Sequence, residues 1–220
     1  MQPGIYGGWS KTWSRWDVSW NETAWYPFKN QHRRSGRGIN DHASAKNVGA
    51  VELATMSFGQ SFQLSPIRLL TSVSAVINGG HSIVPHFGVS IENTSNGSVR
   101  KLSYPQKKKI VSKETSENMK MILESVVTEG SGSKASVEGY QVGAKTGTSE
   151  KLPRRSGKYI ASCIGFAPAD DPKVLAVVLI DEPEGIYYGG TIAAPVVSEL
   201  LDNALPYLGV KKTPQKQTKK

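Results

Sequence analysis

Cysteine is almost missing from this chain of 220 residues, because Cys163 is the single one. One cysteine excludes an intramolecular disulfide and any zinc site built from several thiolates. No run of about 18 apolar residues occurs, so no stretch of the sequence is expected to cross a bilayer as a helix. Tryptophan is missing after residue 25, although the chain holds five of them. These absences indicate a disulfide-free globular protein whose N-terminal part has an unusual composition.

The excess of positive charge, +9 overall, lies at the two ends of the sequence. Residues 47–209 carry 15 basic and 15 acidic side chains, whereas residues 1–46 carry seven and three. A nucleic-acid-binding domain gathers its basic side chains on the folded part, so no nucleic-acid partner is expected. The segment 210–220 has no apolar residue after Val210 and is expected to be a disordered, lysine-rich tail. A weak contact with an anionic polymer or a membrane is the alternative for this tail.

The hydrophobic pattern divides the chain at about residue 46. Residues 1–46 are rich in tryptophan and basic side chains and show no sustained period, whereas residues 47–209 read as alternating helices and strands. Pro66 suits the start of a helix that the pair Gly79–Gly80 ends. A second helix is expected to begin after Ser112, which would cap it. Its apolar face is expected to consist of Met119, Ile122 and Val126.

Extended pieces account for most of the remaining sequence. Residues 81–91 and 98–104 read as two extended pieces joined by a turn. Residues 159–167 and 173–181 read as antiparallel neighbours, because only a tight turn separates them. A last helix is expected over residues 194–208. The sequence therefore predicts an α+β fold in which helices pack on an antiparallel sheet.

Four stretches, taken in order, carry a family resemblance: residues 51–80, 139–151, 159–183 and 187–210. They resemble the C-terminal part of the transpeptidase domain of class B penicillin-binding proteins, in the group of penicillin-binding protein 2 and stage V sporulation protein D. The resemblance implies an incomplete fold of the penicillin-binding protein and serine β-lactamase type for residues 47–209. It implies a peptidoglycan D,D-transpeptidase that works by serine acyl transfer without a cofactor or a metal.

The resemblance also implies binding partners and a location. The expected ligands are the stem peptide of peptidoglycan, which ends in D-Ala-D-Ala, and β-lactam antibiotics, which acylate the same serine. Proteins of cell division, elongation or sporulation are the partners that the resemblance leaves open. The parent protein is expected to be anchored in the cell membrane and to act on its extracytoplasmic face.

The motif Lys145-Thr146-Gly147, followed by Thr148, is the part of the catalytic signature that this sequence contains. By resemblance these four residues lie on a strand that lines the cleft and bind substrate. An ammonium and a hydroxyl suit the terminal carboxylate of the peptide, and glycine lets the peptide approach the strand closely. The backbone N–H of Thr148 is expected to be one donor of the oxyanion hole. An extended peptide is expected to add to the edge of the strand.

The serine nucleophile and its lysine base have no convincing counterpart. Ser131 to Lys134 spells S-x-x-K, but in a glycine-rich loop rather than at the start of a helix. The stretches 116–118 and 19–21 spell S-x-N; the first is expected on the polar face of a helix, the second in the unusual N-terminal segment. The chain is therefore expected to lack both catalytic residues and to be inactive alone. The alternative is a non-catalytic, transpeptidase-like binding module.

Residues 1–46 suggest a translation in the wrong reading frame. Read one base later, the codons of residues 1–3 permit Cys followed by Asn or Ser, the end of an S-C-N motif. The codons of residues 30–38, shifted in the same way, permit Thr-Asn-Ile-Asp-Val-Pro-Gly-Glu-Ala, which resembles the segment expected in the family at this place. The rival hypothesis is an authentic tryptophan-rich segment that stacks on sugar rings.

Other polar residues are expected to have structural roles. Cys163 lies in an apolar strand and is expected to be buried, and His81 and His86 to be surface or packing residues. Glu150 and Lys151 are expected to be solvated at the strand end, and the stretch 170–172 to be a turn. The loop 187–190 either approaches the cleft or is a plain turn before the last helix.

Overall fold

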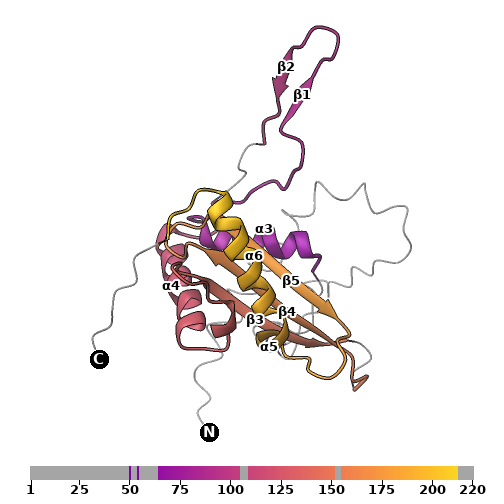
Figure 1. Cartoon of the computed structure of the whole chain (residues 1–220), viewed down its shortest axis with the longest axis vertical. Helices are drawn as coiled ribbons and strands as arrows, with labels where there is room; N and C mark the ends of the chain where they lie inside the picture. Colours follow the sequence, from indigo (N-terminus) through magenta and orange to yellow (C-terminus); the bar gives the residue numbers. More distant parts are fainter. Residues whose placement is uncertain (1–49, 51–53, 55–63, 105–108, 152–154, 213–220) are drawn as a thin grey trace. The chain divides into compact units, whose positions relative to one another are not determined.

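The computed structural model describes residues 50, 54, 64–104, 109–151 and 155–212. Almost all of these belong to one compact unit, residues 69–220 (Figure 1). The elements are α3 (Pro66–Ile77), β1 (Ser90–Glu92), β2 (Val99–Lys101), α4 (Lys113–Thr128), the 3₁₀ turn η2 (Ser133–Ala135), β3 (Gly143–Glu150), β4 (Tyr159–Ala167), β5 (Val174–Asp181), α5 (Gly189–Ile192) and α6 (Ala194–Tyr207). The segment 1–46 and the residues 213–220 of the tail lie outside the described residues, so the hypotheses on them stay predictions.

The main sheet has three antiparallel strands in the order β3-β4-β5. β4 and β5 agree with the strands expected at 159–167 and 173–181, and the stretch 170–172 between them is irregular, as expected of a turn. β3 pairs with β4 from Gly143 opposite Phe166 to Glu150 opposite Tyr159. Because β4 lies in the centre, β3 is an edge strand among the strands that the structure describes.

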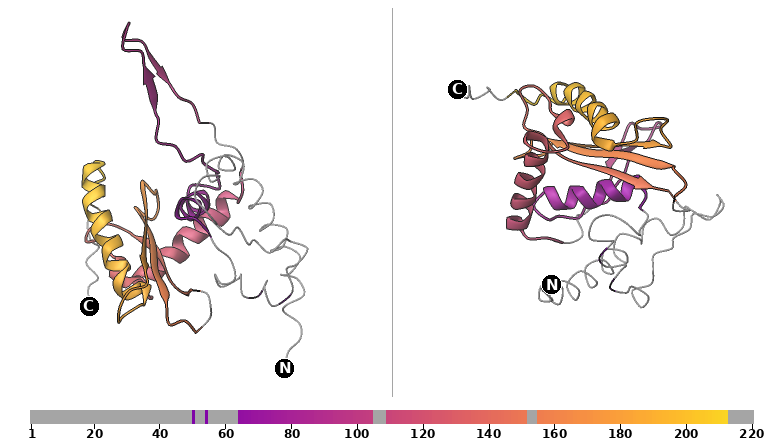
Figure 2. Two further views of the ribbon diagram at one scale, coloured as in Figure 1. Left: turned by 90° about the vertical axis from the view of Figure 1, so that its right-hand side faces the viewer. Right: turned by 90° about the horizontal axis from the view of Figure 1, so that it is seen from below.

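Helix α6 covers one face of this sheet (Figure 2). The first of its buried residues, Ala194 and Val197, are followed at helical spacing by Leu201 and Leu205, and all four join the main core cluster. Cys163 of β4 lies in the same cluster and is fully buried, as its apolar strand predicted. The last helix, expected over residues 194–208, is therefore confirmed, and the structure adds which of its faces is buried.

The opposite face packs on the C-terminal end of α3 and on part of α4. Phe166 of β4 is buried against Ile77 at the end of α3, and Leu123 of α4 packs on the same cluster. Helices thus lie on both sides of an antiparallel sheet, and the α+β expectation is confirmed. None of the helices in the described ranges is long and apolar enough to cross a membrane.

The ends of the first two helices follow their local signals. α3 begins at Pro66 and ends at Ile77, and the next glycines, Gly79 and Gly80, both have positive φ, which stops the helix. The side chain of Ser112 caps α4, because its hydroxyl accepts a hydrogen bond from the N–H of Thr115 at 2.9 Å. Both boundaries were expected from the sequence.

The buried face of α4 differs from the predicted one. Ile122 is 55 % exposed, although it was expected at the centre of the apolar face. The buried positions are instead Ser116, Lys120 and Val127. Ser116 therefore does not lie on the polar face, which corrects the reading of the S-x-N match at 116–118. The hydroxyl of Ser116 is satisfied by the N–H of Gly79, and Lys120 donates to the carbonyl of Asp170.

Strands β1 and β2 form a separate two-stranded hairpin, as the two extended pieces predicted. Ser90 pairs with Lys101 and Glu92 with Val99 in an antiparallel register. All residues of both strands are exposed. The hairpin closes at its base, where the N–H of Ile110 donates to the carbonyl of Gly80 at 2.7 Å.

Candidate functional site

The Lys-Thr-Gly motif lies in the middle of β3. The strand enters from Gly143 and Ala144, which are buried, and becomes accessible at Lys145. Gly143 passes directly over the ring of Phe166, where a Cβ atom would overlap the aromatic carbons. This close packing fixes the start of the strand, so the residues that follow are presented on a firmly held element.

Side chains alternate between the two faces of β3. Thr146 lies opposite Cys163 in the register, and the Cys163 side chain belongs to the core beneath α6. Thr146 and Thr148 therefore project toward the α6 side of the sheet, whereas Lys145 projects toward the other side. The Lys145 ammonium returns to its own strand, because Nζ donates to the carbonyl of Thr146 at 2.8 Å.

A hydrogen bond at the end of β3 shows which backbone groups of this strand point away from β4. The N–H of Lys151 donates to the carbonyl of Lys158 at 2.8 Å, so these two residues form a hydrogen-bonded pair of the ladder. Bonded and non-bonded pairs alternate in an antiparallel ladder. Thr146 and Thr148 lie an odd number of residues before Lys151 and belong to non-bonded pairs. Their N–H and C=O groups point away from β4, toward an edge that no described strand covers.

Both threonine hydroxyls of the motif contact other segments. Thr146 Oγ1 lies 3.1 Å from the hydroxyl oxygen of Ser131, and Thr148 Oγ1 accepts a hydrogen bond from the N–H of Gly189 at 3.2 Å. Ser131 thus lies beside the motif, in a turn before η2, while Lys134 is exposed. The sequence did not predict either contact, because each joins segments that are distant along the chain.

A tyrosine cluster lies between β4 and the loop 187–190. The rings of Tyr159 and Tyr187 are stacked with centroids 4.1 Å apart, and those of Tyr187 and Tyr188 are tilted at 4.6 Å. The hydrogen bond with Tyr188, together with the neighbouring phenols, raises the pKa of Tyr187 to about 12. The loop therefore packs on the strands beside the motif and is more than a plain turn.

The charged end of β3 forms a network of ion pairs. Lys151 Nζ lies 2.9 Å from Asp181 and 2.8 Å from Glu182, and Lys158 Nζ lies 3.0 Å from Glu182. Hydrogen bonds with Glu182 and then Asp181 raise the pKa of Lys151, and those with Lys151 and then Lys158 lower the pKa of Glu182. Lys151 is therefore an ion-paired residue, which corrects the expectation of a merely solvated one.

The histidines lie apart from these contacts. His81 and His86 are both exposed, and the ring of His86 stacks on Tyr104 with centroids 3.7 Å apart, in agreement with surface and packing roles. The described residues contain no cluster of three or more histidine, cysteine, aspartate or glutamate side chains suited to a metal ion.

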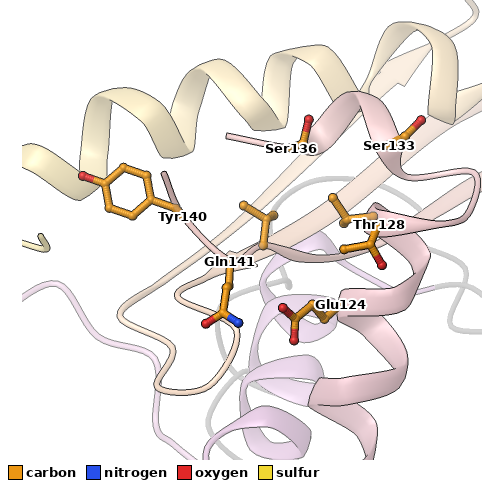
Figure 3. Close-up of a pocket in the computed structure, with 8 residues that line it drawn as sticks. Glu124, Thr128, Ser133, Ser136, Tyr140 and Gln141 are labelled. Carbon is orange, nitrogen blue, oxygen red and sulfur yellow. The ribbon is translucent and has the colours of Figure 1, made fainter. Parts of the chain in front are cut away.

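A pocket of about 480 Å³ lies between α4, η2 and the segment that leads into β3 (Figure 3). Glu124 and Thr128 of α4 line it together with Tyr140 and Gln141. None of the four motif residues contributes to its wall. The pocket is thus separate from the exposed edge of β3, which remains the candidate site.

Comparison with known proteins agrees with this architecture. The family model for the penicillin-binding protein transpeptidase domain matches residues 28–202, a range that begins inside the N-terminal segment set apart above. Stage V sporulation protein D of Bacillus subtilis is 45 % identical over 183 residues, which are 80 % of this chain and 28 % of that protein. A probable peptidoglycan D,D-transpeptidase, PenA, of Neisseria flavescens is 36 % identical over 74 % of this chain and 39 % of its own length.

Solved structures show the same likeness. The transpeptidase domain of penicillin-binding protein 3 from Burkholderia pseudomallei has a TM-score of 0.67 and 31 % identity, covering 79 % of this chain and 51 % of that one. Penicillin-binding protein 3 from Mycobacterium tuberculosis, solved with ampicillin, shares the fold with a TM-score of 0.71 at 22 % identity, over 79 % of this chain and 41 % of its own. The chain spans less than two fifths of the two curated relatives above. By its sequence and its partial fold, the chain belongs to the penicillin-binding protein transpeptidase family.

Proposed function

We propose that this chain supplies the substrate-binding strand of a peptidoglycan D,D-transpeptidase. The free edge of β3 binds an extended stem peptide that ends in D-Ala-D-Ala. The observation that carries the proposal is the pair of outward N–H and C=O groups at Thr146 and Thr148, beside the ammonium of Lys145. An edge strand whose outward backbone groups pair with no other strand accepts an extended peptide as a further strand.

The motif side chains suit the end of such a peptide. The terminal carboxylate accepts hydrogen bonds from the Lys145 ammonium and from threonine hydroxyls, and charge-assisted bonds of this kind are strong. Among the described residues, Lys145 Nζ donates only to a carbonyl of its own strand, which leaves its other hydrogens for an anion. A Cβ atom on Gly147 would lie 2.6 Å from Ser162 Oγ, so glycine allows this close contact between β3 and β4. Lys145, Thr146, Gly147 and Thr148 thus form the proposed binding set.

The proposed chemistry is acyl transfer through serine. A serine oxygen bonds to the carbonyl carbon of the penultimate D-alanine, the peptide bond breaks, and D-alanine leaves with the proton on its amine. An amine on a neighbouring peptidoglycan strand then attacks the ester carbonyl and releases the serine. The Thr148 N–H donates to the carbonyl oxygen while it carries negative charge. We assign the serine and its lysine base to a part of the enzyme outside the described residues.

The same proposal extends to inhibitors and location. β-Lactams bind at the β3 edge because they mimic the peptide terminus, and the whole enzyme acts on the extracytoplasmic face of the cell membrane. Without a nucleophile in the described part, the chain alone binds peptide but forms no acyl-enzyme. A fluorescent penicillin is therefore expected to leave no covalent label, and a label mapped to a serine of this chain would contradict that assignment.

The test is a titration of the isotope-labelled chain with two peptides, followed by amide chemical shifts. An acetylated peptide ending in D-Ala-D-Ala is expected to shift the amides of Thr146 and Thr148, whereas its L-Ala-L-Ala counterpart shifts them far less. Lys145→Met is expected to weaken binding of the first peptide about tenfold, because a charge-assisted bond is lost. Equal binding of both peptides, or shifts that avoid β3, would overturn the proposal.

A further inference from the structure

The start of α5 lies directly on the Lys-Thr-Gly strand. The N–H of Gly189 donates to Thr148 Oγ1 at 3.2 Å, a contact between residues 41 positions apart. Gly189 is buried and Gly190 is half-buried, so both belong to the packed part of the molecule. The proposed function uses Thr148 but gives no role to these glycines.

Close approach, rather than an unusual backbone angle, requires glycine at both positions. A Cβ atom on Gly189 would overlap the backbone oxygens of Gly147 and Ser162, and one on Gly190 would lie 2.6 Å from the carbonyl oxygen of Ser131. Neither glycine has the positive φ that disfavours other residues. The missing side chains therefore allow this loop to rest on β3 and on the turn before η2.

Aromatic packing against β4 also holds the loop in place. Tyr187 stacks on Tyr159 with an interplanar angle of 10°, and Tyr159 lies opposite Glu150 in the ladder between β3 and β4. Gly189 thus follows, two residues later, a ring that is stacked on β4, and it contacts β3 itself. Such support is what a hydrogen bond needs to hold an acceptor in one orientation.

We propose that Gly189 is a positioning residue that orients the Thr148 hydroxyl toward the carboxylate of a peptide bound at the β3 edge. A threonine hydroxyl has one hydrogen and accepts through its lone pairs. Because the Gly189 N–H occupies a lone pair of Thr148 Oγ1, the hydroxyl hydrogen is directed away from Gly189 and is available to an anion. The inference rests on the proposed function, since its ligand is the terminal carboxylate of that peptide.

The first test compares substitutions at Thr148 with two peptides, one ending in D-Ala-D-Ala as the free acid and one as the carboxamide. Thr148→Val is expected to weaken binding of the acid about tenfold, and Thr148→Ser to recover most of that loss. Binding of the carboxamide, which has no anion, is expected to change less than about twofold. A purely structural role would lower the affinity for both peptides alike and would overturn the inference.

The second test addresses Gly189 itself. Gly189→Ala is expected to weaken binding of the acid about tenfold and to leave the weaker binding of the carboxamide nearly unchanged. Gly88→Ala is the matched control, because Gly88 also lacks a positive φ and meets only the side chains of Leu102 and Tyr104 in the hairpin. Faster hydrogen exchange of the Gly189 amide in Thr148→Val gives a readout that does not depend on Gly189→Ala folding.

The two proposals fail in different ways. If the unmodified chain does not bind the acid peptide at β3, the proposed function is wrong. If it binds the acid but Thr148→Val binds it equally well, or if the Gly189 amide exchanges at the same rate in both proteins, the positioning role is wrong and the binding strand stands.

Discussion

The hydroxyl of Ser116 accepts a hydrogen bond from the backbone N–H of Gly79 at 2.9 Å, which ties the first turn of α4 to the turn that ends α3. Ser116 is fully buried, and within α4 it lies one turn before Lys120, which is also buried. A polar side chain at such a position is tolerated because it is satisfied. The contact therefore joins two helices that flank the hairpin in sequence.

Replacing Ser116 by alanine removes this acceptor and leaves the Gly79 N–H without its partner. We expect Ser116→Ala to lower the free energy of unfolding by about 1–3 kcal/mol, the range for an orphaned donor. Urea denaturation measures the loss. Ser125→Ala is the control, because Ser125 is exposed and its hydroxyl bonds only to Ile122 one turn earlier; it is expected to change stability by less than about 0.5 kcal/mol. Equal losses in the two variants would contradict the assignment.

Two neighbouring leucines of α6 test the packing of that helix on the sheet. Leu201 is fully buried, whereas Leu200 is 47 % exposed. We expect Leu201→Ala to cost about 2–5 kcal/mol of unfolding free energy, because it leaves a cavity in the main core. Leu200→Ala is expected to cost about 0.5 kcal/mol. Denaturation midpoints give the comparison, and a larger loss at Leu200 would mean that α6 presents a different face to the sheet.

The ion pairs of Lys151, Lys158 and Glu182 predict a dependence of stability on pH. The folded pKa of Glu182 is lowered, so its contribution is present above its ordinary value of 4.5 and is lost as the pH falls through the folded pKa. The folded pKa of Lys151 is raised, so its contribution is present below 10.5 and is lost as the pH rises through the folded pKa. Between these limits the contribution is expected to be constant.

The measurement is the difference in melting temperature between the unmodified chain and Glu182→Gln over this pH range. We expect the unmodified chain to melt higher at pH 7 and the difference to vanish in acid, once Glu182 is protonated. Glu182 and Lys158 are exposed and Lys151 is half-buried, so the difference is also expected to shrink in about 1 M salt, where the Debye length is about 3 Å. A difference that persists in acid would show that Glu182 acts by packing and not by charge.

The thiol of Cys163 is expected to be unreactive in the folded chain. It is fully buried beneath α6, and burial raises its pKa to about 11, although the nearby Lys145 opposes the shift. Because the thiolate is the reactive form, a disulfide reagent at pH 8 should label it slowly until urea is added. Ser149→Cys, at an exposed position of β3, is the control and is expected to react at once. Rapid labelling of Cys163 without urea would contradict its burial.

Local signals in the sequence predicted much of this fold. Pro66 and Ser112 marked the starts of α3 and α4, and a last helix was expected over residues 194–208, where α6 lies. Each of these signals acts within one or two helical turns. The antiparallel pairing of β4 with β5 was also predictable, because a short turn leaves strands few other arrangements.

The buried face of α4 could not be read in the same way. The stripe through Ile122 is more apolar than the stripe through Ser116 and Lys120, so periodicity favoured the wrong side. The structure buries the more polar stripe because its partners, Gly79 and Asp170, lie far away in sequence. The apolar period of a helix does not indicate which distant residues will pack against it.

The candidate site was likewise predicted only in part. The strand with Lys145 and Thr148 was predicted, but its contacts with Ser131 and Gly189 were not. The only signal for the second contact was the glycine pair at 189–190, which equally suits a simple turn. Close approach of two backbones becomes visible only once the strand and the loop are placed in space.

The hairpin offers a practical route to observing this protein. Its strands are exposed on every residue, its base is closed between Gly80 and Ile110, and no atom outside the immediate chain lies within 4 Å of a Cβ built on Gly97 at its tip. A fluorophore or an epitope attached at the tip would therefore report on the molecule without touching its core or the Lys-Thr-Gly strand. The same geometry makes residues 93–98 a natural point for immobilising the chain on a sensor surface.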